Sequence, residues 1–75
     1  MKEFLEAIAK MLVDNKDAVK VTEEENEEGI YLSLSVAEDE IGKVIGKDGK
    51  IAKAIRTIVR SGARNTGKRV FIDIE

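Results

Sequence analysis

The 75-residue chain contains no cysteine, histidine, proline or tryptophan, and it has only three aromatic residues. Without cysteine the chain can form neither disulfide bonds nor thiolate metal sites. The absence of histidine removes the commonest general base and the commonest transition-metal ligand. The first twelve residues include acidic side chains and lack a long apolar run, which argues against a signal peptide or a membrane span. We therefore expect one small cytoplasmic domain with a core of barely sufficient size.

The net charge of −2 conceals a strong separation of charge along the chain. Residues 1–41 carry twelve acidic and four basic side chains, whereas residues 42–69 carry nine basic side chains and one acidic one, Asp48. A chain divided in this way presents a basic face that attracts polyanions, although the whole molecule is slightly acidic.

The spacing of apolar residues predicts six elements in the order α-β-β-α-α-β. A first helix is expected from the helical recurrence of Phe4, Leu5, Ile8, Met11 and Leu12. Alternating or β-branched residues predict strands over 19–22, 30–36 and 69–74, with an acidic turn over 23–29. A short helix is expected from residue 38 to about residue 45, and a long one from about 50 to 65. The acidic residues 38–40 suit the start of a helix, because they complement its dipole.

This element order predicts an α+β fold in which residues 1–75 form a single domain, with three helices on one face of a three-stranded sheet. The first two strands are joined by a short loop and are expected to form a hairpin. Two helices separate the second strand from the third, which is the crossover that a parallel pair requires. The sheet is therefore expected to be mixed.

The long helix is predicted to carry basic residues along one side. Five of them fall within a roughly 120° arc: Lys50, Lys53, Arg56, Arg60 and Arg64. The side expected to face the sheet is formed by Ile51, Ala54, Ile55, Ile58, Val59 and Gly62. A charged stripe is ordinarily just a solvated surface, but no Asp or Glu lies at i±4 to neutralise this one. Such an uncompensated stripe favours a polyanionic partner.

Directly before that helix stands Gly46-Lys47-Asp48-Gly49. Backbone amides at a helix N-terminus can bind a phosphate, although two glycines can also mark nothing more than a tight connection. The spacing is too short for a P-loop, and a dinucleotide-binding turn would follow a strand rather than a helix. What remains is the helix–turn–helix clamp with which KH domains hold a sugar-phosphate backbone.

Residues 41–56, IGKVIGKDGKIAKAIR, resemble the signature of a type II, prokaryotic KH domain. The whole chain resembles the KhpA family of small bacterial single-KH-domain proteins. This resemblance implies a cytoplasmic RNA-binding protein without enzymatic activity or cofactor, linked to RNA chaperoning and post-transcriptional regulation. It also implies a homodimer, or a heterodimer with a larger KH-containing protein of the KhpB (Jag/EloR) type. In some bacteria such pairs are linked to cell shape and cell wall biogenesis.

The resemblance assigns RNA-binding roles to ten residues: Lys43, Ile45, Gly46, Lys47, Asp48, Gly49, Lys50, Ala52, Lys53 and Arg56. The four turn residues would form the clamp, Ile45 and Ala52 would line an apolar floor for bases, and the remaining cations would flank the RNA. About four single-stranded nucleotides would bind. Asp48 departs from a phosphate-binding pattern and predicts a weak grip. The small Ala52 and the absence of aromatics from the clamp predict low sequence specificity.

Alternatives remain for the function of the protein and for the role of residues 61–63. The acidic half and Asp48 favour a protein–protein adaptor that uses the KH fold for dimerisation without binding RNA. The small-residue segment 61–63 allows close packing against a second copy, or Gly62 fits beneath the last strand. A metal enzyme on residues 38–40 is disfavoured, because adjacent carboxylates on one helical turn point in different directions.

Overall fold

A computed structural model describes residues 1–63 and 67–75. Its elements are α1 (Lys2–Leu12), η1 (Lys16–Ala18), β1 (Lys20–Glu25), β2 (Gly29–Ser35), η2 (Glu38–Glu40), α2 (Ile41–Ile45), η3 (Lys47–Gly49), α3 (Lys50–Gly62) and β3 (Arg69–Ile74). The three η segments are short 3₁₀ turns. The predicted α-β-β-α-α-β order is confirmed. Arg64, expected at the end of the basic stripe, lies outside the described residues.

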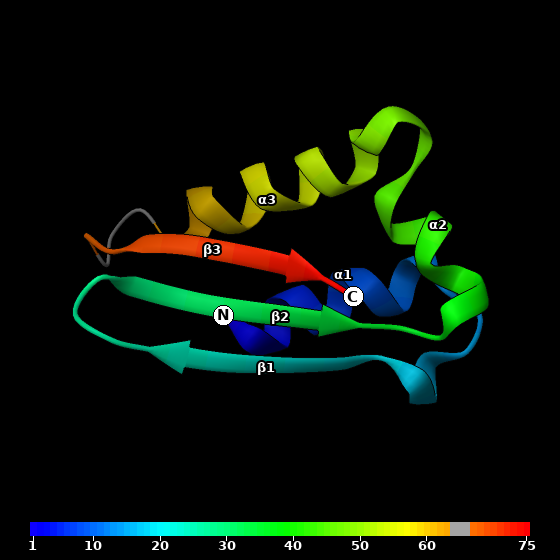
Figure 1. Ribbon diagram of the computed structural model, residues 1–75, viewed down its shortest axis with the longest axis horizontal. Helices are drawn as coiled ribbons and strands as arrows, with labels where there is room; N and C mark the ends of the chain where they lie inside the picture. The colour runs from blue at the N-terminus through cyan, green and yellow to red at the C-terminus, as the bar shows by residue number, and fades with distance from the viewer. Residues whose placement is uncertain (64–66) are drawn as a thin grey trace.

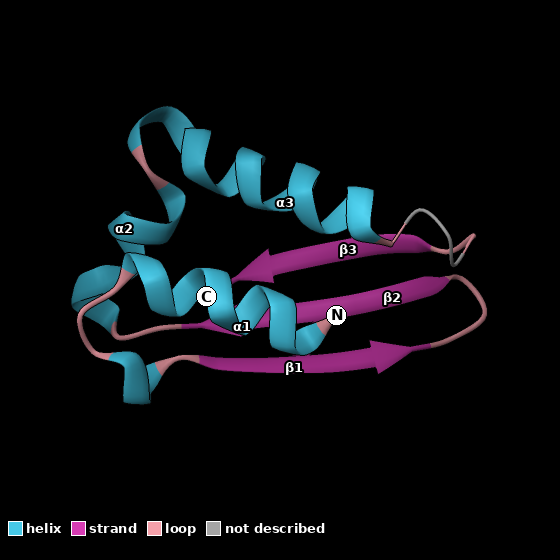
Figure 2. Cartoon of the chain, turned by 180° about the vertical axis from the view of Figure 1, so that it is seen from behind, coloured by secondary structure: helices cyan, strands magenta, loops and turns pink. Residues whose placement is uncertain are grey.

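The sheet has the strand order β1-β2-β3, in which β1 pairs antiparallel with β2 and β2 pairs parallel with β3. The predicted mixed topology is therefore confirmed. In Figure 1 the sheet lies in front of α1, and in Figure 2, seen from behind, α1 lies in front of the sheet. The helices thus cover one face of the sheet and leave the other face open. Within the described ranges, no helix is long and apolar enough to cross a membrane.

The core lies between the helices and the covered face of the sheet. Leu5 on α1, Leu34 on β2, Val44 on α2 and Val59 on α3 have no exposed surface. Alternation along β2 explains why Ile30, Leu32 and Leu34 share this face, since successive strand residues point to opposite sides. Each helix therefore contributes to one core.

The hairpin between β1 and β2 differs from the prediction. Strand β1 continues to Glu25, so half of the expected acidic turn belongs to the sheet. The remaining turn is built on Asn26, whose side-chain oxygen accepts hydrogen bonds from the amides of Glu28 (2.8 Å) and Gly29 (3.2 Å). An asparagine that binds the backbone two residues on is a standard turn former, and it allows a shorter loop.

The orientation of α3 about its axis also differs from the prediction. Ile58 is 47% exposed, and Ala54 and Gly62 are also exposed, although all three were expected to face the sheet. The buried side is instead formed by Ala52, Ile55, Val59 and Ala63. These residues follow i, i+3, i+4 spacing, and the two alanines let the helix approach the sheet closely. On α1, the predicted core residues Phe4 (48% exposed) and Met11 (84% exposed) likewise face outward.

Truncating a core residue tests this assignment. We expect Leu34→Ala to lower the free energy of unfolding by about 3 kcal/mol, because a fully buried leucine leaves a cavity. Met11→Ala should change it by less than about 0.5 kcal/mol, because its side chain is exposed. Urea unfolding of both variants measures the two effects, and equal losses would contradict the assignment.

Candidate nucleic-acid interface

The turn between α2 and α3 is held by backbone bonds at its two glycines. The amide of Gly46 donates to the Gly42 carbonyl (2.9 Å) and ends α2. The amide of Gly49 donates to the Gly46 carbonyl (3.2 Å). The amides of Lys47 and Asp48 take no part in these bonds, and no side chain caps the start of α3. The apex of the turn can therefore offer backbone donors together with the positive end of a helix dipole.

The two glycines of the turn serve different purposes. Both have a φ of 74°, which favours glycine. A Cβ on Gly46 would lie 2.6 Å from the side chain of Ile51, whereas a Cβ on Gly49 would meet nothing within 4 Å. Gly46 is therefore required by internal packing as well as by its backbone conformation. Beside Gly49 there is open space that a ligand could enter.

Asp48 stands between them with a φ of 57°, and it is the one non-glycine residue with positive φ in the described ranges. Aspartate and asparagine enter this left-handed region more readily than other side chains. The backbone thus gives a physical reason for an aspartate here. The residue is exposed, and its carboxylate forms no ion pair within residues 1–63 and 67–75.

The basic face, as we define it, consists of Lys47 in the turn and of Lys50, Lys53 and Arg56, which follow the turn on α3. The three lysines are exposed and the arginine is half-buried. None of the four forms an ion pair within residues 1–63 and 67–75. This confirms that the predicted stripe is uncompensated at Lys50, Lys53 and Arg56. A fourth member of the stripe, Arg60, donates a hydrogen bond from its Nε to the Val70 carbonyl (3.4 Å). At 1.5 Å per residue, Lys50 and Arg56 lie about 9 Å apart along the helix axis.

The two residues expected to form an apolar floor differ in exposure. Ile45, at the end of α2, is 36% exposed, whereas Ala52 is only 4% exposed and packs inward. Nearly all of the exposed apolar surface that this pair offers therefore belongs to Ile45.

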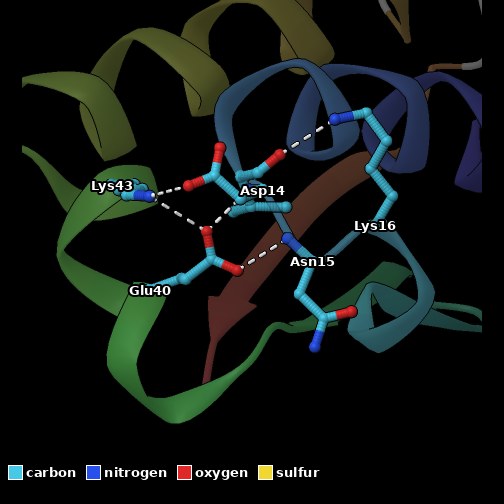
Figure 3. Close-up of polar contacts among 6 residues, drawn as sticks. Asp14, Asn15, Lys16, Glu40 and Lys43 are labelled. Carbon is cyan, nitrogen blue, oxygen red and sulfur yellow. Dashed lines mark hydrogen bonds and ion pairs between the residues drawn. The ribbon is translucent and has the colours of Figure 1, made fainter.

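Lys43 is placed differently from the other expected RNA-binding cations. Its ammonium group pairs with the carboxylates of Asp14 (2.9 Å) and Glu40 (3.1 Å), as Figure 3 shows. These contacts raise the pKa of Lys43 above its ordinary value, with the hydrogen bond to Asp14 as the largest cause. Because Lys43 is already paired with two carboxylates, it attracts a phosphate less strongly than the residues of the basic face do.

Glu40 is the centre of this second cluster. Its side chain is buried, and its carboxylate accepts hydrogen bonds from the amides of Asp14 (2.6 Å) and Asn15 (2.9 Å), just beyond the end of α1. These bonds, that of Asp14 first, hold the pKa of Glu40 below its ordinary value of 4.5. Figure 3 shows that the carboxylate joins the start of α2 to the segment after α1.

No pattern in the sequence indicated this link. We expected residues 38–40 to serve only as the start of a helix, but Glu40 contacts amides 25 and 26 residues away. No local pattern reveals such a partner. The link matters to the candidate site because it fixes the short helix that precedes the turn.

The link makes stability depend on pH. The folded pKa of Glu40 is lowered, so its contribution is present above the unfolded pKa of 4.5 and is lost as pH falls through the folded value. We expect the urea midpoint of the wild type to fall more steeply than that of Glu40→Gln between about pH 5 and about pH 3. Glu38→Gln, an exposed neighbour, is the matched control and should follow the wild type. Parallel curves for Glu40→Gln and the wild type would contradict the link.

Comparison with known proteins shows which family this chain resembles. The family described as "KhpA/KhpB, KH domain" matches residues 2–74. A protein of Clostridium acetobutylicum named "RNA-binding protein KhpA" is 53% identical over 74 residues, which span 99% of each chain. A protein of Aquifex aeolicus with the same name is 51% identical, across 99% of this chain and 94% of the relative.

A solved structure shares the fold. The crystal structure of Aquifex aeolicus Era bound to GDP and aluminium fluoride superimposes with a TM-score of 0.70 at 22% identity. The match covers 97% of this chain and 28% of Era, so the chain corresponds to a small part of that protein. At this identity the likeness concerns the fold alone. On its family match and its curated relatives, the chain belongs to the KhpA/KhpB family of KH-domain proteins.

Proposed function

We propose that this protein binds single-stranded RNA through the turn 46–49 and the basic face. The main support for the proposal is the arrangement of donors and cations at the turn. The amides of Lys47 and Asp48 take no part in the hydrogen bonds that hold the turn, and the basic face beside them forms no ion pair within the described residues. The names of the curated relatives, which are called RNA-binding proteins, support it. Such a protein would act in the cytoplasm as an RNA chaperone or post-transcriptional regulator.

In this proposal the phosphates of about four nucleotides follow the turn and the first two turns of α3. The open space beside Gly49 admits the sugar-phosphate backbone, and Lys47, Lys50 and Lys53 neutralise it. Ile45 supplies the apolar contact for a base. Lys43 acts indirectly, because its ion pairs hold α2 in place.

The grip should be weak and tolerant of sequence. The carboxylate of Asp48 repels phosphate at the apex of the turn. Two of the aromatic residues, Tyr31 and Phe71, lie on the sheet, and Phe4 lies on α1, so no ring stacks on bases at the turn. Four phosphate contacts predict a slope of about −3 for log affinity against log salt concentration, at 0.7 per contact for a single strand.

Opposite charge changes at adjacent positions test the proposal. We expect Lys47→Asp to weaken binding of an RNA of about eight nucleotides by about tenfold or more, because one attraction becomes a repulsion. Asp48→Asn should strengthen it by about threefold, because asparagine keeps the left-handed backbone and removes the repulsion. Fluorescence anisotropy at several salt concentrations measures both changes.

The matched controls are Lys20→Asp and Asp39→Asn, which make the same charge changes on exposed residues of β1 and η2. Both should bind RNA as the wild type does, with the fold checked by circular dichroism. Equal affinity of Lys47→Asp and the wild type would overturn the proposal. Binding of a protein partner that is insensitive to salt, with no RNA binding, would instead support the adaptor function.

We further propose that the protein works as a pair of KH domains, either with a second copy or with a larger KH-containing protein. A single weak clamp gains useful affinity when two are linked. The exposed Ile58 on α3 lies beside two small exposed residues, Ala54 and Gly62, and a Cβ on Gly62 would meet nothing within 4 Å. This apolar strip allows close packing of a second helix, whereas Ala63 is buried and cannot take part.

Sedimentation equilibrium tests the pairing of identical copies. We expect the wild type to dimerise with increasing concentration, and Ile58→Asp to weaken the dimer by about tenfold or more, because it places a charge in an apolar contact. Thr57→Asp makes the same charge change one residue away and should dimerise normally. A wild type that stays monomeric at millimolar concentration would contradict self-association through this strip.

A further inference from the structure

The face of the sheet opposite the helices carries aromatic and acidic side chains that the RNA proposal does not use. Strand register places Glu24, Tyr31 and Phe71 in one row across the three strands. The next row consists of Thr22, Ser33 and Asp73. These residues line a hollow of about 340 Å³, with the small Thr22 and Ser33 between the aromatic pair and the far end of the sheet.

An aromatic pair lies on the open face of the sheet. The rings of Tyr31 and Phe71 stack with centroids 4.8 Å apart and an angle of 13° between their planes. Phe71 is 39% exposed and Tyr31 is half-buried, so both rings keep part of their surface accessible. Such an arrangement leaves apolar surface and electron-rich ring faces available to a ligand.

The pair is also held in place before any ligand arrives. The hydroxyl of Tyr31 donates to the carboxylate of Glu28 (3.2 Å). The ring of Phe71 leans over Gly29, where a Cβ would lie only 3.2 Å from the ring and 2.5 Å from the Arg69 carbonyl. A glycine is therefore required beneath the ring. Preorganised side chains lose little conformational entropy on binding.

The charge of the hollow is negative and uncompensated. Glu24 and Asp73 are exposed, and neither forms an ion pair within the described residues. Cations on this face lie at its two ends, with Lys20 opposite Ser35 and Arg69 opposite Gly29, and neither lines the hollow. RNA is repelled by such a site, whereas a cationic side chain is attracted.

We infer that this open sheet face docks an arginine-bearing basic segment of a partner protein. A guanidinium is planar, so it can lie on a free ring face while it forms a charge-assisted hydrogen bond with Asp73 or Glu24. An extended segment could place successive basic side chains toward both carboxylates. The site lies on the opposite side of the sheet from α1, and it acts independently of the RNA site.

A defined probe is a peptide of three Arg-Gly-Gly repeats, titrated into the ¹⁵N-labelled full chain. We expect its amide shifts to concentrate at Tyr31, Ser33, Phe71 and Asp73. The matched Lys-Gly-Gly peptide should bind at least about threefold more weakly, because an ammonium group cannot stack. A citrulline peptide, which keeps the planar shape without the charge, should lose about tenfold.

The double variant Glu24→Gln/Asp73→Asn should weaken binding of the arginine peptide by about tenfold. Glu27→Gln/Glu38→Gln, which removes the same charge from exposed positions outside the hollow, should change it less than about twofold. Lys47→Asp should leave it unchanged. This last arm separates the two proposals, because RNA binding can fail while peptide binding persists.

Equal losses in the two double variants would overturn the inference, since they would show attraction to net charge alone. Shifts confined to α3 would also overturn it. If RNA moves the amides of the hollow, the face is a nucleic-acid site. If Glu24→Gln/Asp73→Asn lowers the mass of the protein alone in sedimentation, the face binds a second copy. Either result would replace the proposed partner.

Discussion

The backbone conformation of the turn between α2 and α3 is the constraint on which the candidate site depends. Gly46, Asp48 and Gly49 all have positive φ, so the chain reverses within four residues and α3 starts directly at the turn. The contact between Gly46 and Ile51 fixes this geometry from inside. As a result the apex amides, the open space beside Gly49 and the basic face meet in one place.

Basic and acidic side chains lie on different parts of the molecule. The basic residues follow the turn along α3, and the acidic residues lie mainly on β1, its hairpin and η2. Where the two signs meet, they are used for structure: Lys43 and Glu40 tie α2 to the end of α1. In the two proposals the basic face binds RNA, whereas Glu24 and Asp73 on the open face of the sheet bind a basic segment of a partner. One small domain would thereby offer two surfaces of opposite preference.

The sequence was sufficient for features that depend on local pattern. Element order, sheet topology and the glycine turn followed from spacing, turn residues and connection length. Features that depend on tertiary contact were not predictable. The side of α3 that is buried was misjudged because two alanines, rather than Ile58, face the sheet. The role of Glu40 was missed because its partners are 25 and 26 residues away. The positive φ of Asp48, which gives a physical reason for an aspartate in the turn, likewise depends on the folded backbone and was not visible in the residue pattern.

The most direct test of the central claim is chemical-shift mapping of the full chain with a short single-stranded RNA. We predict that the largest amide shifts fall between residues 45 and 56, centred on Lys47 and Asp48. We also predict that those shifts fade as salt is added. Shifts concentrated on the sheet or on α1, or no shifts at low salt, would contradict the central claim.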